Sequence, residues 1–218
     1  MTRGGAKVEP ESATEDRPLR RDAELNLARI VVAARDVFSE YGYDASMEQI
    51  AIRADVGVGT LYRRFPTKAD LCAAVMESAN DRTRQIAEAV LADAVPGEAV
   101  FEFVRRCVAA PSCWRAITSQ RLWSGDGADR AVSALLPIMA RLVTESQDAG
   151  TVRDDIVATD LVVLLMSVRA VADLCDADAR DTSLRFLDLA LDGLRPGGRS
   201  PSQDPMTAEQ LIRVLGSD

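Results

Sequence analysis

Residues 57–68 bring together side chains and backbone groups that can bind phosphate. Gly57 and Gly59 leave backbone amides accessible, and amides at the start of a helix attract anions. Hydroxyl and cationic side chains follow directly, namely Thr60, Tyr62, Arg63, Arg64 and Lys68. The guanidinium of Arg63 can in addition bond the edge of a guanine through two N–H groups. The segment therefore has the chemistry needed to hold a nucleic-acid backbone and to read a base.

Catalytic and metal chemistry has far weaker support. The 218 residues include no His, which removes the commonest general base and the commonest metal ligand. The cysteines form no closely spaced pair, so we expect no zinc site and interpret them as buried, reduced thiols. Sensing of oxidants would require a thiol with a depressed pKa. We expect no metal, no cofactor and no enzyme activity, and no spacing in the sequence points to an active site made of carboxylates alone.

Three predicted helices position the phosphate-binding groups. The first runs from about residue 21 to residue 41, with apolar side chains at intervals of three and four. Ser46 and Gln49 form a capping box that begins a two-turn helix. A tight turn over residues 55–57 then leads to a third helix over residues 58–65. This is a helix-turn-helix arrangement, in which the second helix of the pair enters the major groove of DNA.

Pairs of short amphipathic helices also occur in all-α proteins that do not bind DNA. The alternative function is therefore a helical ligand carrier or interaction protein without DNA function. In that alternative Tyr62 and Phe65 are core residues, and the surface of residues 46–65 tolerates acidic substitutions. The turn glycines and the distribution of charge favour DNA binding.

Charge is distributed unevenly along the chain. The net charge of −8 argues against nucleic acid when it is taken alone. Most of the acidity, however, lies in residues 77–218, whereas residues 17–76 are close to neutral. Arg20 and Arg21 form one of two cationic groups there, and they are candidates to reach a phosphate or the minor groove. The alternative is that these two side chains only solvate the end of a helix.

The rest of the chain is also predicted to be helical, so the expected fold class is all-α. A fourth helix is expected from Thr67 to about residue 93, and Pro137 should kink a later helix or mark its start. Residues 1–18 are polar and without periodicity, which predicts a disordered N-terminal arm. No stretch has the length and apolarity of a signal peptide or a membrane-spanning helix, so we expect a soluble, cytoplasmic protein. The remaining expected helices are 97–109, 111–123, 128–149, 158–174 and 179–194, followed by a short segment capped by Thr207 and Gln210.

The string IAIRADVGVGTLYRRFPTKADLCAAV, residues 50–75, resembles the signature of the TetR family of bacterial repressors, IAxxAGVxxGTLYxxFxxKxxL. With the preceding helix the resemblance covers about residues 20–76. Residues 149–161, AGTVRDDIVATDL, are more weakly similar to a junction in the ligand domain of that family. Two positions depart from the pattern. Asp55 replaces the usual turn glycine, although Asp tolerates a left-handed conformation, and Arg64 stands where His is frequent.

The resemblance implies an N-terminal three-helix helix-turn-helix DNA-binding domain over residues 19–76. A larger helical ligand-binding and dimerisation bundle would follow over residues 77–195, then a linker and a short C-terminal helix over residues 196–218. It also implies a repressor that binds a palindromic DNA operator as a homodimer and is released by a small-molecule effector. The resemblance implies that Gly59, Thr60, Tyr62 and Lys68 contact phosphates and that Val58, Arg63 and Arg64 approach bases. The local pattern adds Ser46 and Gly57 to the DNA-binding candidates, and the charge pattern adds Arg20 and Arg21.

Two further sets of candidates lie in the C-terminal part of the chain. For the effector pocket they are Phe101, Phe103, Arg105, Trp114, Trp123, Met139 and Met166, and for the aromatic and Met residues the alternative is a plain core position. Four helices, two from each subunit, would form the dimer interface. The candidates for that interface are Leu161, Leu164, Leu165, Val168, Leu184, Leu187, Leu191 and Leu194, and the alternative is that these leucines and valines form only the core of one chain.

Overall fold

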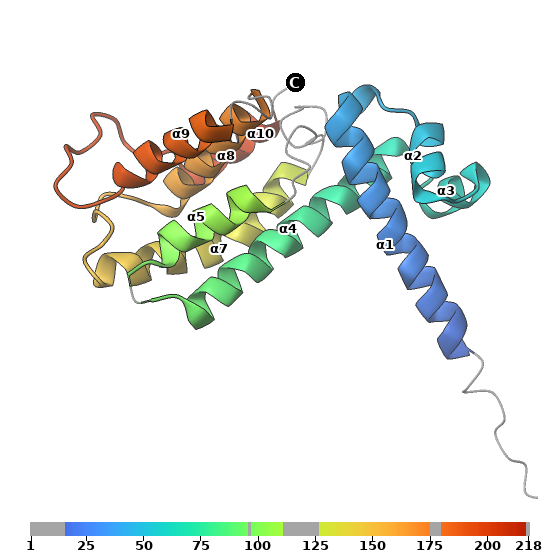
Figure 1. The fold of residues 1–218 in the computed structure, drawn as a ribbon, viewed down its shortest axis with the longest axis horizontal. Coiled ribbons are helices and arrows are strands. Elements are labelled where there is room, and N and C mark those ends of the chain that lie inside the picture. The colour runs from blue at the N-terminus through green and yellow to red at the C-terminus, as the bar shows by residue number, and fades with distance from the viewer. Residues whose placement is uncertain (1–15, 96, 111–126, 175–179, 217–218) are drawn as a thin grey trace, which may run out of the picture.

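The computed structural model describes residues 16–95, 97–110, 127–174 and 180–216 (Figure 1). All regular secondary structure within these ranges is helical, which confirms the all-α prediction for this part of the chain. Figure 1 shows two groups of helices, with α1, α2 and α3 on one side and the later helices on the other. The long helix α4 connects the two groups. The expected helix over residues 111–123 lies outside the described residues.

The first helix is longer than predicted. Helix α1 (Asp16–Tyr41) is followed by a 3-10 turn, η1 (Gly42–Asp44), and Gly42 adopts a left-handed φ of 66°. Residues 16–18, which were expected to belong to a disordered arm, are therefore helical, while residues 1–15 lie outside the described range. Pro18 is compatible with this earlier start, because the N–H that proline lacks has no helical partner in a first turn.

Local signals set the ends of the next two helices. Helix α2 (Met47–Ala54) begins with the predicted capping box, in which the Gln49 amide donates to Ser46 Oγ at 3.2 Å and the Ser46 amide donates to Gln49 Oε1 at 2.7 Å. Asp55 takes the left-handed conformation expected of the turn, with φ 54°. Helix α3 (Val58–Arg64) follows and buries Leu61 completely.

Helix α4 (Lys68–Asp93) belongs to both groups of helices. Its 26 residues correspond to about 39 Å of helix. Leu71 and Val75 lie in a buried cluster with residues of α1, α2 and α3, whereas Ala87 and Val90 lie in the second cluster, with residues of the C-terminal helices. A continuous helix that contributes to both cores connects the two groups mechanically.

Four helices follow in the C-terminal group: α5 (Ala99–Ala109), α7 (Gly127–Asp148), α8 (Ala158–Leu174) and α9 (Arg180–Asp192). Helix α7 runs through Pro137 instead of starting there. Helix α8 packs against α5, α7 and α9. No helix in the described ranges is long and apolar enough to cross a membrane.

The last helix is α10 (Ala208–Gly216). It packs against α7, and its Leu211 and Leu215 are buried in the cluster that also holds the core of α1 to α3. The predicted cap is present, because the Gln210 amide donates to Thr207 Oγ1 at 3.2 Å and the Thr207 amide donates to Gln210 Oε1 at 2.8 Å. The C-terminal segment therefore shares one buried cluster with α7 and with the helix-turn-helix domain.

Candidate DNA-binding face and effector cavity

Helix α3 has one buried face and one open face. Leu61 is buried within the chain, and so is Phe65 directly after the helix. Tyr62 is 43% exposed and Val58 is 36% exposed, so neither is a core residue. Of the two side chains that the alternative without DNA binding assigned to the core, only Phe65 is buried. The exposed residues of α3 and its N-cap are Gly57, Val58, Gly59, Tyr62, Arg63 and Arg64, and Thr60 is half-buried.

The glycines at the start of α3 are not explained by the chain itself. Gly59 does not have a left-handed φ, and a Cβ atom built there would meet nothing within 4 Å. A Cβ at Gly57 would meet only Thr60 Oγ1, at an ordinary contact distance of 3.8 Å. The first turn of α3 also has no side-chain cap. Glycine therefore leaves open surface here, where another molecule can approach the backbone closely.

Two arginines at the end of α3 carry uncompensated charge. Arg63 and Arg64 are exposed and form no hydrogen bond or ion pair with any residue that the structure describes. Arg53 on α2 differs, because it bonds Glu40 through two contacts of 2.9 and 2.8 Å. That bond to Arg53 lowers the pKa of Glu40, and the same bond raises the pKa of Arg53. Arg63 and Arg64 thus remain available for an external anion.

Lys68 has an internal role that the sequence did not reveal. Its ammonium donates to the backbone carbonyl of Tyr43 and lies 4.4 Å from the centroid of the Tyr43 ring. This contact ties the first residue of α4 to η1. Sequence spacing gives no signal for it, because the two residues approach only after the helices pack. On the next turn of α4, burial raises the pKa of the Cys72 thiol to about 12, which opposes a role for this cysteine as a redox-sensing thiolate.

The other DNA-binding candidates lie around this face or beyond it. Ser46 is the N-cap of α2, and both its amide and its hydroxyl take part in the capping box. Arg20 and Arg21 lie near the start of α1, in the part of the helix that extends past α2 and α3 in Figure 1. Their side chains are not among those that the structure describes.

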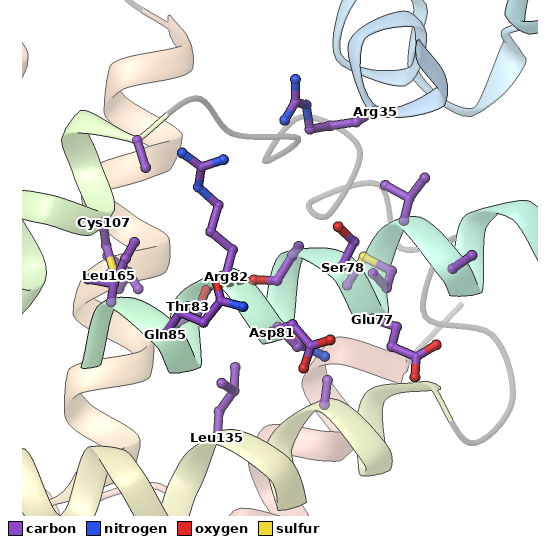
Figure 2. Close-up of a pocket in the computed structure, with 18 of the residues that line it drawn as sticks. Arg35, Glu77, Ser78, Asp81, Arg82, Thr83, Gln85, Cys107, Leu135 and Leu165 are labelled. Carbon is purple, nitrogen blue, oxygen red and sulfur yellow. Dashed lines mark hydrogen bonds between the residues drawn. The ribbon is translucent and has the colours of Figure 1, made fainter. Parts of the chain in front are cut away.

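A cavity of about 590 Å³ lies between the two groups of helices, lined by residues of α1, α4, α5, α7, α8 and α10 (Figure 2). Of the predicted effector residues, Met139 and Met166 line it. Phe101 and Phe103 do not, because both are completely buried in the core of the C-terminal helices. Arg105 is exposed and also lies outside the lining. Trp114 and Trp123 fall outside the described residues.

The effector residues predicted from the sequence did not include any from α1, which also lines this cavity. Leu27 and Val31, which were assigned to one wide apolar stripe, line the cavity together with Arg35. The stripe therefore faces two different neighbours along its width. Periodicity gives the apolar side of a helix and not the identity of the element that covers it.

Most of the proposed dimer-interface residues prove to be core residues of a single chain. Leu161, Leu165, Val168, Leu187, Leu191 and Leu194 are all buried in the absence of a partner, since α8 and α9 pack against each other and α8 also against α5 and α7. Their burial matches the alternative of a core within one chain, and their assignment to an interface stays a prediction. Of that set, only Leu164, which is half-buried, and Leu184, which is 47% exposed, remain accessible. Val163 and Leu189 add further exposed apolar surface on the same two helices.

Comparison with known proteins agrees with this geometry. Residues 30–75 match the family of bacterial regulatory proteins named tetR, and residues 95–196 match the C-terminal domain of SbtR-like transcriptional regulators. The TetR transcriptional regulator SCO0520 from Streptomyces coelicolor is 34% identical, with a TM-score of 0.61 over 79% of this chain and 99% of the other. This chain belongs to the TetR family of transcriptional regulators.

Other TetR-family proteins show similar agreement. A TetR transcription regulatory protein from Mycobacterium vanbaalenii is 36% identical, with a TM-score of 0.60 over 82% of this chain and 99% of that one. An HTH-type transcriptional regulator from Staphylococcus aureus is 43% identical over 60 residues, which are 27% of this chain and 32% of that protein. The chain thus matches about a third of the length of such curated relatives. Family membership supports a regulator and not an enzyme.

Proposed function

We propose that this TetR-family protein is a repressor that binds a palindromic operator as a homodimer and is released by a small molecule. The observation that carries the DNA-binding part is the open face of α3. On this face no close contact within the chain and no left-handed φ requires glycine at position 59. Arg63 and Arg64 have no partner among the described residues. A surface with close access to the backbone and uncompensated cations suits the phosphates and base edges of DNA.

The residues of this face divide by their chemistry. The hydroxyls of Thr60 and Tyr62 and the remaining N–H groups of Lys68 suit phosphate oxygens, which fix the position of the protein on the duplex. Val58, Arg63 and Arg64 are candidates for base edges, Val58 through the methyl group of thymine and the arginines through guanine. Arg20 and Arg21 are additional candidates, at the protruding end of α1.

A palindrome requires two recognition helices and therefore two subunits. The outward surfaces of α8 and α9 favour this role, because Leu184 is 47% and Leu189 61% exposed in the single chain. Leu164 and Val163 lie on α8 with partial exposure. An isologous contact of these two helices with their copies would cover the apolar side chains. The buried leucines of the same helices would then support the interface from inside.

Ligand binding in the cavity can affect DNA binding, because the two sites share helices. Helices α1 and α4 both line it, and both belong to the core that holds α2 and α3. A ligand that fits the cavity better in one arrangement of these helices shifts the population toward that arrangement. The spacing of the two recognition helices in the dimer would change with it, which would lower the affinity for the operator.

The test measures fluorescence anisotropy of a labelled duplex from the DNA upstream of the gene. Affinity should fall roughly a thousandfold or more between about 50 and 200 mM salt, because several phosphate contacts release counterions. Tyr62→Glu should abolish binding, whereas Val95→Glu makes the same change in charge at an exposed site at the far end of α4 and should not. Tolerance of Tyr62→Glu, or the absence of salt-sensitive binding, would favour the alternative of a ligand carrier.

A further inference from the structure

Arg82 is a charged side chain in the lining of the cavity that has no partner among the described residues. It lies on α4 and forms no ion pair or hydrogen bond with any of them. Figure 2 shows its side chain extending into the hollow, on the opposite side of α4 from the carboxylates of Asp81 and Glu77. Helical spacing explains this division. Glu77 and Asp81 are four residues apart and share a face, while Arg82 points about 100° away from Asp81.

The other charged groups in the lining are already compensated or lie apart from Arg82. Asp81 accepts a bond from Arg84 at 3.2 Å. Arg35, from α1, is paired with its neighbour Asp36 at 2.8 Å. Glu77 is exposed and lies on the other face of α4. Among the described residues that line this part of the cavity, Arg82 therefore carries the one positive charge without a partner.

The remaining walls are largely apolar. Leu135 and Met139 come from α7, and Leu165 and Met166 come from α8. Leu27 and Val31 close the side formed by α1. Methionine side chains adapt to ligands of different shape. A volume of about 590 Å³ is typical of sites for small molecules.

We propose that this cavity binds an anionic amphiphile, a molecule with a carboxylate at one end and an apolar chain or ring system at the other. The carboxylate bonds the guanidinium of Arg82, which offers two parallel N–H donors. The apolar part lies against Leu135, Met139 and Leu165. Because Leu27 and Val31 belong to α1, the same ligand contacts the helix that supports the helix-turn-helix. This inference rests on the proposed function only in taking the cavity as the effector site.

The test uses isothermal titration calorimetry on the full chain with three probes that share one apolar chain. They are decanoate and decyltrimethylammonium, each below its critical micelle concentration, and decan-1-ol below its solubility limit. Decanoate should bind at least about tenfold more tightly than the alcohol, since a hydrogen-bonded charge adds that much affinity. Equal affinity for the alcohol, tighter binding of the cation, or no saturable binding of decanoate would each overturn the proposal.

Two arginine variants test where the carboxylate of decanoate binds. Arg82→Gln should reduce decanoate affinity about tenfold, to the level of the alcohol, and leave the affinity for the alcohol unchanged. Arg141→Gln is the matched control, because Arg141 is exposed on α7 outside the lining, and its partner Glu145 also lies outside the lining. It should leave both affinities unchanged. Unchanged decanoate affinity in the Arg82 variant overturns the proposal.

Operator binding by the same preparations separates this inference from the proposed function. If decanoate binds through Arg82 but the protein does not bind DNA, the ligand class stands and the repressor proposal fails. If the protein binds DNA in a salt-sensitive way while decanoate affinity is independent of Arg82, the repressor proposal stands and the ligand class fails. Arg82→Gln without ligand should retain operator affinity, because Arg82 lies in the second half of α4 and lines the cavity, and it is not part of α3.

Discussion

Gly59→Ala should make the protein more stable and a weaker DNA binder. The glycine lies within α3, where alanine is favoured by up to about 1 kcal/mol. The added Cβ meets nothing within 4 Å, so no clash offsets this gain. The free energy of unfolding should rise by as much as about 1 kcal/mol, which corresponds to about 2–4 °C in Tm for a chain of this size. Since an operator would approach this backbone closely, affinity for it should fall at least about tenfold.

Circular dichroism melts and operator anisotropy, measured on one preparation, test both halves of this expectation. Ser133→Ala provides a control, because it improves helix propensity at an exposed position of α7, outside the candidate DNA-binding face. It should raise Tm slightly and leave operator affinity unchanged. If Gly59→Ala raises Tm without any loss of affinity, the reasoning that this glycine keeps space for DNA is refuted. A fall in Tm would refute the claim that a Cβ atom at position 59 meets no clash.

Three further predictions concern other parts of the structure. Lys68→Met should lower the free energy of unfolding by about 1–2 kcal/mol in a urea titration, because it removes the bond to the Tyr43 carbonyl and the contact with its ring; an unchanged urea midpoint would contradict this. Bonding by Arg153 holds the pKa of Asp155 at about 2, against an ordinary value of 3.8, so its contribution to stability is present above pH 3.8 and is lost as the pH falls toward 2. Asp155→Asn should flatten the stability profile over that window, and an unaltered profile would count against the assignment. Leu184→Glu should convert the proposed homodimer to a monomer in sedimentation velocity, and a dimer that persists in the variant would exclude this surface from the interface.

The helix-turn-helix was predictable from sequence because residues close to the helix ends determine where its helices begin and end. The capping box at Ser46, the left-handed turn at Asp55 and the cap at Thr67 act within three or four residues of the helix ends they determine. Each of these signals can therefore be recognised in the sequence without knowledge of the rest of the fold. The early start of α1 was missed, since polar composition around Pro18 does not prevent a first helical turn.

The C-terminal candidates were less predictable, for a physical reason. Helix α8 is apolar around much of its circumference, which shows that it is covered on several sides but not by which helix. Leu161 and Val168 are covered by their own chain, and Phe103 faces the core and not the cavity. Arg82 went unnoticed because its significance depends on what faces it across the fold. Such assignments follow from packing between distant segments, which no short spacing encodes.

The position of α10 has a consequence for the order of events during synthesis. Leu211 and Leu215 share a buried cluster with α1, α2 and α3, although the ribosome makes them long after those helices. A nascent chain that has emerged only as far as α9 holds every residue of the recognition face and still lacks part of the core beneath it. Complete folding of the helix-turn-helix domain would then wait until the C-terminal segment is released, and a chain cut short before residue 208 would expose an apolar surface to chaperones and proteases.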